Sequence, residues 1–514
     1  MSKRRYITTA IDYPNAAPHM GHVLEKVLAD VIARWWRLSG DAVRFQIGTD
    51  EHGVKIQQTA DREKVTPQEL VDRNVPIFQK LYEDLGISAD VFIRTTDKKK
   101  HWPTVAALWR KLSDAGALEK RTYTGLYCSG CERFVTAKDL IDGKCPDHGI
   151  VPTQVKEENW FFLLKKEEQW LKKLLKDSYT IVPSSRAHET LSLLEAGLED
   201  VSFSRPKSSL AWGIPVPGDE DQTMYVWCDA LTNYISGIDY FGLAEGHERG
   251  PKGRVEWWDD AEVTHVIGKD IARFHALIWP AMLKNADVRT PDRLLIHGFL
   301  TSEGQKMSKS VGNVVVPQEV IAKYGVEPLR FYLSHEIPVG NDGDFSWKRF
   351  GELYDAKLRN QLGNLLNRVL VLLQKEGGTI DLEVTKEDVK SAAESRKKYE
   401  EHMNAFELSQ AMQFAFEQVA CMNVFINEQK PWEKSGAEKT QTLSVLAESL
   451  RQISLLLLPF LPQTAQEISL QLNVPYAKKM LGNDFVITNE MKEWGSQTKW
   501  KKVGKPKILF APVE

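Results

Sequence analysis

Residues 5–47 constrain the fold more than any other stretch of the chain. The first of them, 5–11, alternate and are rich in Tyr, Ile and Thr, which predicts a strand that leads into a proline-containing turn. From His19 to Gly40, apolar residues recur at helical spacing, and residues 42–47 predict a second strand. A strand, a turn, a helix and a second strand make a βαβ unit. We therefore expect an α/β fold built on a doubly wound, Rossmann-like parallel sheet.

The helix of this unit opens on Pro18-His19-Met20-Gly21-His22. Two histidines three residues apart place both imidazoles on one side of the first helical turn. Helix N-termini carry unpaired N–H groups and the positive end of the helix dipole, which makes them anion sites. In a doubly wound sheet this turn also lies where ligands bind, outside the carboxyl ends of the strands. The pattern predicts a phosphate site.

A second basic cluster follows far downstream, at Lys306-Met307-Ser308-Lys309-Ser310, between Gly304 and Gly312. Taken alone, this segment reads as an ordinary solvated basic turn. Together with the histidine pair, it supplies cations on a loop that can move onto a phosphate group.

Two closely spaced pairs of residues predict a metal knuckle: Cys128-x-x-Cys131 and Cys145-x-x-His148. Three thiolates and one imidazole form a tetrahedral donor set suited to zinc. Four protein ligands leave no position for a catalytic water, so the expected role is structural. The alternative is four unrelated residues in a loop.

At 514 residues the chain is too long for one hydrophobic core. The sheet pattern stops after Gly116, where a β-rich module begins, and resumes with strands expected at 264–268 and 294–298. Beyond Trp347 the sequence predicts a bundle of leucine-rich helices. The expected parts are 1–116 and 224–297 for the two halves of the sheet domain, 117–223 for an insertion with the knuckle, 298–350 for the region of the basic cluster, and 351–514 for the helical bundle. Expected helices include 67–85, 101–115, 160–177, 362–373 and 443–458, and further strands are expected at 123–131, 211–216 and 224–227.

The net charge of −3 gives no overall basic field, so a nucleic-acid partner would have to be held by local patches. The N-terminal residues lack the apolar core of a signal peptide, and no uncharged apolar run approaches the ~18 residues of a membrane span. We expect a cytoplasmic protein without a membrane partner.

The two signatures and the module between them resemble those of the class I aminoacyl-tRNA synthetases, HIGH and KMSKS. Met20 takes the place of the isoleucine. Within this class the chain is similar to the methionyl-tRNA synthetases of bacterial type with a single zinc knuckle. The blocks that carry the similarity are AIDYPNAAPHMGH, GTDEHG, WGIPVP, YVWCDALTNY, VIGKDIARFHALIWPAML, HGFLTSEGQKMSKSVGN and KPW.

The resemblance implies a two-step reaction. Methionine and ATP, with Mg²⁺, give methionyl-adenylate and pyrophosphate, and methionine then passes to the 3′-terminal adenosine of tRNA(Met). The sheet domain would be catalytic, the insertion connective and the helical bundle anticodon-binding. Zinc would be structural, with one ion per chain.

The resemblance also assigns residues to ATP. His19, His22, Lys306 and Lys309 would be the catalytic groups that neutralise charge on the phosphates. The remaining expected ATP contacts are Gly21, Gly268, Asp270 and Ser308.

Methionine, by the same resemblance, would be held by Asp50 at its ammonium group. The walls of its pocket would be Ala10, Ile11, Trp227, Tyr234, His275 and Trp279. Without the resemblance, Trp227 and Trp279 would be assigned to a core and His275 to a satisfied core histidine.

For the anticodon, the resemblance implies that Trp432 stacks on a base. Asn360, Asn364 and Arg368 are spaced i, i+4, i+8 and would share one helix face that contacts base edges. A polar face of the bundle is the alternative for these three residues.

Departures from the family pattern occur at Asp12 and at Thr232-Asn233, which all adjoin the expected methionine pocket. The chain ends without the tRNA-binding extension that dimerises some members, so we expect a monomer with no obligate protein partner. Synthetases for leucine, isoleucine or valine carry a larger insertion, and those for cysteine need a zinc in the central pocket. A nucleotidylyltransferase would end soon after its sheet, and a non-catalytic paralogue would have lost one signature.

Overall fold

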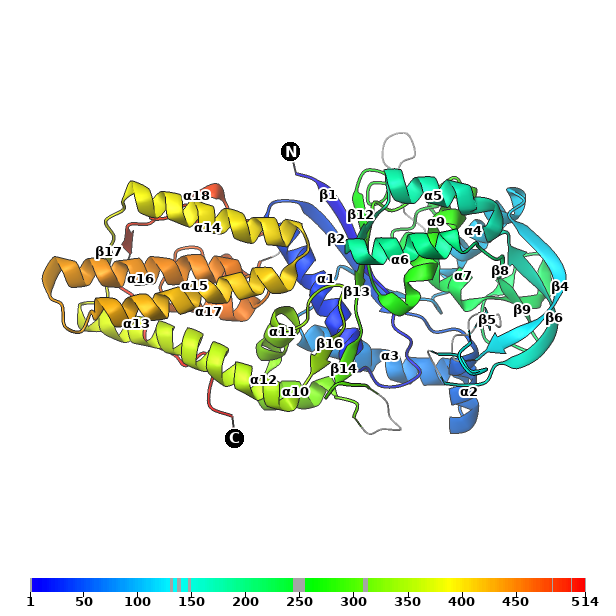
Figure 1. Cartoon of the computed structure of the whole chain (residues 1–514), viewed down its shortest axis with the longest axis horizontal. Helices are drawn as coiled ribbons and strands as arrows, with labels where there is room; N and C mark the ends of the chain where they lie inside the picture. Colours follow the sequence, from blue (N-terminus) through cyan, green and yellow to red (C-terminus); the bar gives the residue numbers. More distant parts are fainter. Residues whose placement is uncertain are drawn as a thin grey trace.

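The computed structural model describes residues 2–129, 133–135, 140–146, 149–243, 255–307, 313–482, 484–500 and 502–513. They form an elongated molecule in which a half that contains the central sheet adjoins a half built of long helices (Figure 1).

A six-stranded parallel sheet forms the centre of the first half, in the order β3-β2-β1-β12-β13-β7. Its strands are β1 (Arg4–Thr9), β2 (Ala42–Thr49), β3 (Val91–Arg94), β7 (Thr180–Val182), β12 (Glu262–Gly268) and β13 (Arg293–His297). Successive strands are added on one side of β1 as far as β3 and on the other side from β12 onward. The gap between β1 and β12 is therefore the switch point at which such sheets bind ligands. The expected doubly wound sheet is confirmed.

Helix α1 (Met20–Leu38) joins β1 to β2 and contributes much of the core. It begins at the N-cap His19, and apolar residues such as Val27 and Val31 are fully buried. Gly40 follows the helix with φ of +90°, a conformation that glycine adopts without strain. The other helices of this half are α2 (Val54–Glu63), α3 (Pro67–Asp84), α4 (Trp102–Asp114), α5 (Glu168–Asp177), α6 (Ser184–Glu195), α7 (Val226–Leu231), α8 (Asn233–Ser236) and α9 (Trp279–Asn285).

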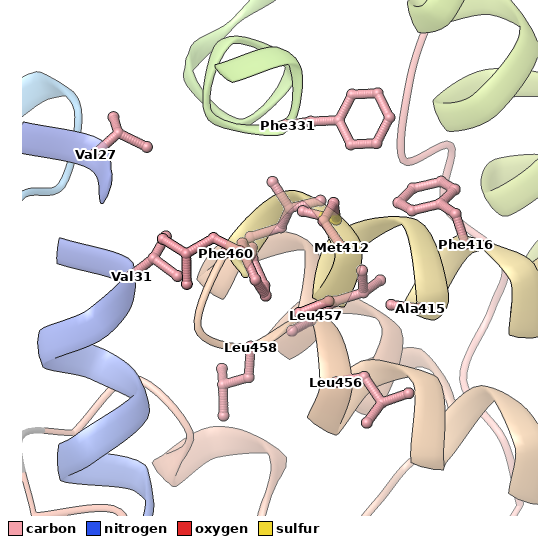
Figure 2. Close-up of a cluster of buried hydrophobic side chains, with 14 of the residues drawn as sticks. Val27, Val31, Phe331, Met412, Ala415, Phe416, Leu456, Leu457, Leu458 and Phe460 are labelled. Atoms are coloured by element: carbon pink, nitrogen blue, oxygen red, sulfur yellow. The ribbon is translucent and has the colours of Figure 1, made fainter. Parts of the chain in front are cut away.

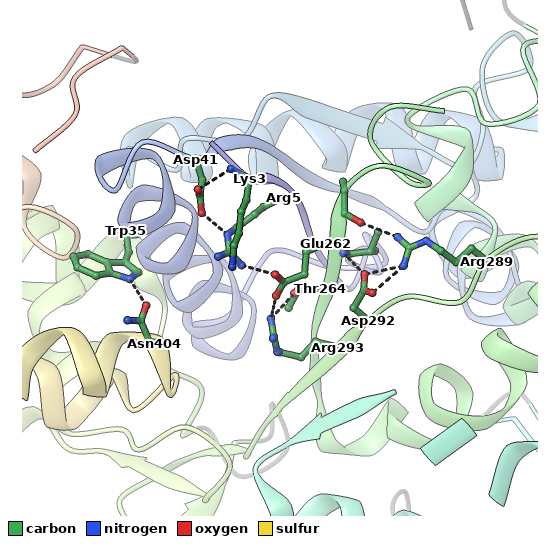
Figure 3. A network of polar contacts seen from close by, with 12 residues as sticks. Lys3, Arg5, Trp35, Asp41, Glu262, Thr264, Arg289, Asp292, Arg293 and Asn404 are labelled. Atoms are coloured by element: carbon green, nitrogen blue, oxygen red, sulfur yellow. Dashed lines mark hydrogen bonds and ion pairs between the residues drawn. The ribbon is translucent and has the colours of Figure 1, made fainter. Parts of the chain in front are cut away.

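Charged side chains link the strands at their amino ends (Figure 3). Arg5 on β1 pairs with Asp41 at 2.6 Å and with Glu262 on β12 at 2.9 Å, and Arg293 on β13 also binds Glu262. These contacts join the neighbouring strands β1, β12 and β13 at their amino-terminal ends, whereas the switch point lies at their carboxyl-terminal ends.

The insertion is built on a long antiparallel pair, β4 (Leu118–Cys128) and β6 (Thr153–Phe162). The shorter strands are β5 (Arg133–Val135), β8 (Val201–Ser202), β9 (Ser204–Pro206), β10 (Pro215–Val216) and β11 (Asp219–Met224). The prediction of a helix from residue 160 was wrong at its start, because residues 160–162 end β6 and pair with β4. Phe161 and Phe162 are both buried, and such a run fits either a buried strand or a helix.

Two further differences concern elements next to the sheet. The strand expected at 224–227 ends at Met224, and α7 begins at Val226. Strand β7 comes from within the segment expected to form the insertion, yet it pairs with β13 at the edge of the central sheet. With three residues, β7 is too short for a periodicity to register.

The second half is a helical bundle, as expected. Helices α10 (Pro317–Tyr324), α11 (Val326–His335) and α12 (Trp347–Leu353) precede it in the region of the basic cluster. The bundle itself contains α13 (Asn364–Lys375), α14 (Lys386–Asn404), α15 (Leu408–Gln429), α16 (Gly436–Leu457), α17 (Pro462–Gln471) and α18 (Asn489–Lys492), with a two-stranded pair of β17 (Ile380–Asp381) and β18 (Lys499–Trp500). Apolar side chains from α1, α11, α15 and the end of α16 meet where the two halves join, among them Val31, Phe331, Met412 and Phe460 (Figure 2). Across the described ranges, no helix is long and apolar enough to cross a membrane.

Residues Tyr354–Gly363 adopt a π-helix between α12 and α13. This segment contains Asn360, for which regular α-helical spacing was expected. A second π-helical turn, Phe274–Ile278, precedes α9. Such turns occur often at functional sites, and a 3.6-residue period does not reveal them.

Candidate functional site

The histidine pair lies at the N-terminus of α1, beyond the carboxyl end of β1. The two imidazoles are stacked, with ring centroids 3.8 Å apart and an angle of 20° between the ring planes. His19 is exposed and His22 is half-buried. Gly21 lies between them, and a Cβ atom there would lie 3.0 Å from Cε1 of His19. Both rings therefore lie on one side of the first turn, as expected, and the glycine makes room for the first ring.

Hydrogen bonds to the backbone fix the tautomer of each ring. Nδ1 of His19 accepts from the N–H of Gly21 at 3.1 Å, and Nδ1 of His22 accepts from the N–H of His19 at 3.1 Å. A neutral imidazole that accepts at Nδ1 carries its proton on Nε2. Burial, followed by the charges of His19 and Lys26, lowers the pKa of His22 well below its usual value. The helix start thus presents two Nε2–H donors.

A buried lysine lies behind this pair, one turn further along α1. Lys26 has no exposed side-chain surface, and its ammonium donates to Oδ1 of Asp12 at 2.8 Å, to Oε1 of Glu25 at 2.9 Å and to the carbonyl of Ala10 at 2.9 Å. Tyr82 on α3 donates to the second oxygen of Asp12 at 2.6 Å. Although Lys26 opposes the effect, burial raises the pKa of Asp12 to about 6.

This network holds the backbone segments that contain the residues predicted to bind the methionine substrate. The N–H of Asp12 donates to the carbonyl of Gly48 at 2.9 Å, and the carbonyl of Asp12 accepts from the N–H of Asp50 at 2.8 Å. Asp50, directly after β2, is buried, whereas Ala10 and Ile11 remain partly exposed. Asp12, where the sequence departs from the family pattern, therefore forms a buried ion pair with Lys26.

Aromatic residues from α7, α8 and the helix after β12 meet on the other side of the switch point. The ring of Trp227, which is partly exposed, stacks on Phe274 with centroids 3.8 Å apart and 9° between planes. His275 meets Trp227 edge-on at 6.2 Å. Phe274, the first residue of the π-helical turn Phe274–Ile278, was not among the predicted pocket residues.

Two neutral histidines anchor this aromatic group. His275 donates from Nδ1 to the carbonyl of Ile271 at 3.0 Å and accepts at Nε2 from the hydroxyl of Tyr234 at 2.6 Å. Burial lowers the pKa of His275 to about 4. Trp279 is fully buried and donates to Nε2 of His265 at 3.2 Å, so it lies behind the first layer of rings.

A buried carboxylate connects the two sides of the site. Asp229 accepts from His52 at 2.6 Å and from His101 at 2.6 Å, and His101 also contacts Ser236 at 2.7 Å. Burial opposes its charge, but His52 and His101 hold the pKa of Asp229 below its usual value. Asp229 lies two residues after Trp227, and His52 lies two residues after the Asp50 position. No local pattern predicts these contacts, because they join segments that are far apart in the sequence.

Of the remaining predicted ATP residues, Gly268 and Asp270 lie at the carboxyl end of β12, and Lys306 lies in a small sheet. Gly268 ends β12, and a Cβ atom there would lie 2.7 Å from Oδ1 of Asp270. Strands β14 (Leu300–Ser302) and β15 (Gln305–Lys306) form a hairpin, and β14 also pairs with β16 (Gly343–Phe345). Lys306 ends β15, while Ser308 and Lys309 lie outside the described residues.

The knuckle is described only in part. Cys128, at the end of β4, and Cys145 are both buried and belong to one small cluster with Val135. Cys131 and His148 lie outside the described residues. Within the ranges that the structure describes, no group of three or more possible metal ligands occurs.

The predicted anticodon residues lie in the helical half. The turn between α15 and α16, which carries Trp432, is at the end of the molecule far from the central sheet (Figure 1). Trp432 is 47% exposed, and the guanidinium of Arg368 lies 5.6 Å from its ring centroid. Arg368 also donates to Asn427 at 2.9 Å, which adds a residue that helical spacing did not single out. Asn360 and Asn364 are both exposed.

Two family models match the chain. One is described as tRNA synthetases class I (M) and matches residues 5–155 and 135–370. The other is described as the anticodon-binding domain of tRNA ligase and matches residues 389–508.

Similar proteins have one name in common. A methionine–tRNA ligase of Fusobacterium nucleatum is 38% identical over 100% of this chain and 80% of its own length. One from Brucella suis is 38% identical over 94% of both chains. Methionyl-tRNA synthetase of Mycobacterium tuberculosis, solved in complex with methionyl-adenylate, has a TM-score of 0.89 and 35% identity, and covers 99% of this chain and 100% of its own. Its free form gives a TM-score of 0.82 at 32% identity.

Proposed function

Because the chain belongs to the methionine type of class I tRNA synthetases, we propose that it is a methionine–tRNA ligase. It activates L-methionine with ATP to methionyl-adenylate and pyrophosphate, and then transfers methionine to the 3′-terminal adenosine of tRNA(Met) with release of AMP. The observation that carries the proposal is the pair of Nε2–H donors at the N-terminus of α1, located at the switch point of the sheet beside an aromatic group.

The first step needs charge neutralisation and alignment, since the methionine carboxylate itself attacks the α-phosphorus. Charge develops on phosphate oxygens, and no enzyme nucleophile is required. His19 and His22 would donate from Nε2 to those oxygens, aided by the positive end of the α1 helix dipole. Their tautomers are already fixed by the backbone, so the donors need no reorganisation when ATP binds.

The departing pyrophosphate would be met from the other side by the basic cluster. Lys306, Ser308 and Lys309 are proposed for this role because Lys306 ends the β14–β15 hairpin and the other two follow it in sequence. Gly268 and Asp270, at the end of β12, are proposed to contact the nucleoside. Mg²⁺ would accompany ATP as part of the substrate.

The methionine substrate would lie at the switch point, with Asp50 on one side of it and Trp227 on the other. A buried carboxylate at Asp50 suits the α-ammonium group. The thioether is soft and weakly accepting, and so suits a pocket walled by Trp227 and neutral His275 with Tyr234. Trp279 would support this wall from behind. Ala10 and Ile11 complete the proposed pocket.

The tRNA would place its 3′-terminal adenosine at the sheet domain and its anticodon at the helical bundle. Trp432, with Arg368 against its ring, offers a stacking surface for an unpaired base, and the exposed amides of Asn360 and Asn364 can reach base edges. The match to an anticodon-binding domain over residues 389–508 supports an anticodon site in the part of the chain that contains Trp432; Asn360, Asn364 and Arg368 precede the matched segment.

We also propose a structural zinc in the insertion, held by Cys128, Cys131, Cys145 and His148. Two buried thiols in one cluster fit such a donor set, and four protein ligands would make the ion a crosslink rather than a catalyst. A monomeric state and a cytoplasmic location remain predictions.

The test is amino-acid-dependent exchange of pyrophosphate into ATP, measured with each of the twenty amino acids. We expect exchange with methionine and little with the others. Exchange that depends on a different amino acid would refute the specificity, and no exchange with any of them would refute the enzyme class.

A further inference from the structure

A pocket of about 240 Å³ lies in the helical half, among α14, α15 and α16 and the segment after α18. Its mouth includes the exposed Ser391, and its inner wall includes the buried side chains of Ile453 and Leu456. None of the residues proposed above for ATP, methionine or the anticodon lines it. Its volume is the share of roughly eight liquid water molecules, which is room for a small organic molecule.

One wall of the pocket is a buried arginine. Arg396 on α14 is only 8% exposed and donates from Nη2 to Gln452 at 3.2 Å, while its Nη1 is buried without a hydrogen-bond partner. Nearby acids are already engaged: Asp388, which also lines the pocket, accepts from the Thr385 hydroxyl at 2.7 Å. Glu400 binds Lys492 at 2.9 Å and Glu448 binds Arg451 at 2.6 Å.

No ion pair within 4.0 Å involves Arg396 anywhere in the part of the chain that the structure describes. Burial lowers the pKa of this guanidinium from its usual value. A buried cation without an anionic partner is costly, and a bound anion would offset that cost.

A second unsatisfied donor lies in the same wall. Nε1 of Trp494 is buried and has no hydrogen-bond partner among the described residues. An indole N–H can only donate, as can a guanidinium. Two donors of this kind in one pocket wall favour a ligand with acceptor oxygens and negative charge, such as a carboxylate.

Apolar side chains make up much of the remaining wall. Met422 and Phe425 on α15 face Ile453 and Leu456 on α16 across the pocket. A bare anion would leave this surface in contact with water, whereas an apolar tail would cover it.

We propose that this pocket binds a small carboxylate with a compact apolar tail, its head on Arg396 and Trp494 and its tail between α15 and α16. The site goes beyond the proposed ligase reaction and does not depend on it. A ligand that binds here would stabilise the bundle, because it binds the folded state only.

The test is a ligand-observed NMR titration of the full chain with 4-methylpentanoate, which has about eight non-hydrogen atoms and so matches the volume. We expect saturable binding. Arg396→Gln should weaken it roughly 10- to 150-fold, the range for a lost hydrogen bond to a charged group. Trp494→Phe, which keeps the ring and removes the N–H, should weaken it several-fold. Lys397→Gln removes an exposed charge from the next position of α14 and should leave binding unchanged.

Two probes separate the head from the tail. Acetate lacks the tail and 4-methylpentanamide lacks the charge, so each should bind at least about 10-fold more weakly than 4-methylpentanoate. The proposal is overturned if 4-methylpentanoate shows no saturable binding, if the amide or acetate binds equally well, or if Arg396→Gln and Trp494→Phe both bind like the wild type. A cooperative thermal unfolding transition in each of the two variants establishes that they fold.

Discussion

Replacement of Lys26 by methionine removes one ammonium group and keeps an apolar chain of similar length. The ammonium makes three contacts of 2.8 to 2.9 Å, two of them to buried carboxylates. Removal of one partner of a buried ion pair typically costs about 3–5 kcal/mol, because the remaining charge stays buried. We expect Lys26→Met to lower the unfolding free energy by an amount in this range near pH 7. Asp12 would then take up a proton, since its pKa is already raised to about 6 with Lys26 present.

The same change should weaken methionine binding selectively. Lys26 holds Ala10 and Asp12, and the backbone of Asp12 in turn positions Asp50. Loss of a hydrogen bond to a charged group is worth about 1.5–3 kcal/mol, which corresponds to roughly a 10- to 150-fold change in affinity. We therefore expect the KM for methionine in pyrophosphate exchange to rise at least ~10-fold, whereas the KM for ATP stays within a few-fold.

Two further variants make this prediction decisive. Lys80→Met removes an exposed lysine of α3 and should change neither KM nor stability. The double variant Lys26→Met with Asp12→Asn removes the orphaned charge as well, so its loss of stability should be smaller than the sum of the two single losses. The reasoning is refuted if Lys26→Met folds with normal stability and binds methionine within twofold of the wild type.

Four other outcomes follow from the site. His22→Ala or Lys309→Ala should lower pyrophosphate exchange at least ~100-fold with little change in methionine affinity, since both are proposed to act on the transition state; an unchanged rate would contradict their roles. Trp432→Ala should leave exchange intact but lower kcat/KM for tRNA roughly 5- to 150-fold, as expected for about 1–3 kcal/mol of lost base stacking; equal damage to both assays would argue against a separate anticodon site. Metal analysis of the folded chain should give about one zinc per chain, and Cys145→Ser should lower both zinc content and melting temperature; a metal-free folded protein would remove the knuckle. Because the pKa of Asp12 is about 6 in the folded state and 3.8 in the reference state, the folded chain binds more protons between these values and loses stability as pH rises through them. Asp12→Asn should abolish this loss, at most about 3 kcal/mol between pH 4 and pH 7, and parallel pH profiles of the two proteins would show the assignment to be wrong.

The sequence was most informative where a local pattern repeats over several turns or ends on a distinctive residue. The presence of β1, α1 and β2 follows from alternation, helical spacing and Gly40, although β1 ends at Thr9 rather than at residue 11 and β2 ends at Thr49 rather than at residue 47. The position of His19 and His22 on one side of the first turn follows from their separation on a helix start. These features depend on neighbours in sequence, so the residues alone determine them.

What the sequence did not reveal depends on contacts between distant segments. The sequence showed Asp12 only as a departure from the family pattern before the first signature, and did not reveal its ion pair with Lys26. The Asp229 contacts with His52 and His101 join segments about 130 to 180 residues apart. The π-helical turns at Phe274 and Tyr354 and the short strand β7 also escape periodicity, because each is fixed by packing rather than by propensity.

The order of strands in the central sheet also has a consequence for synthesis on the ribosome. β1 is flanked on one side by β12, and the paired residues Arg5 and Glu262 are 257 positions apart. At about 5–20 residues per second, β1 emerges roughly 13 to 50 seconds before its second neighbour exists. During that interval one edge of β1 in the β1–α1–β2 unit has no partner strand. A holding chaperone that covers this edge would raise the yield of active enzyme and leave the stability of the folded protein unchanged.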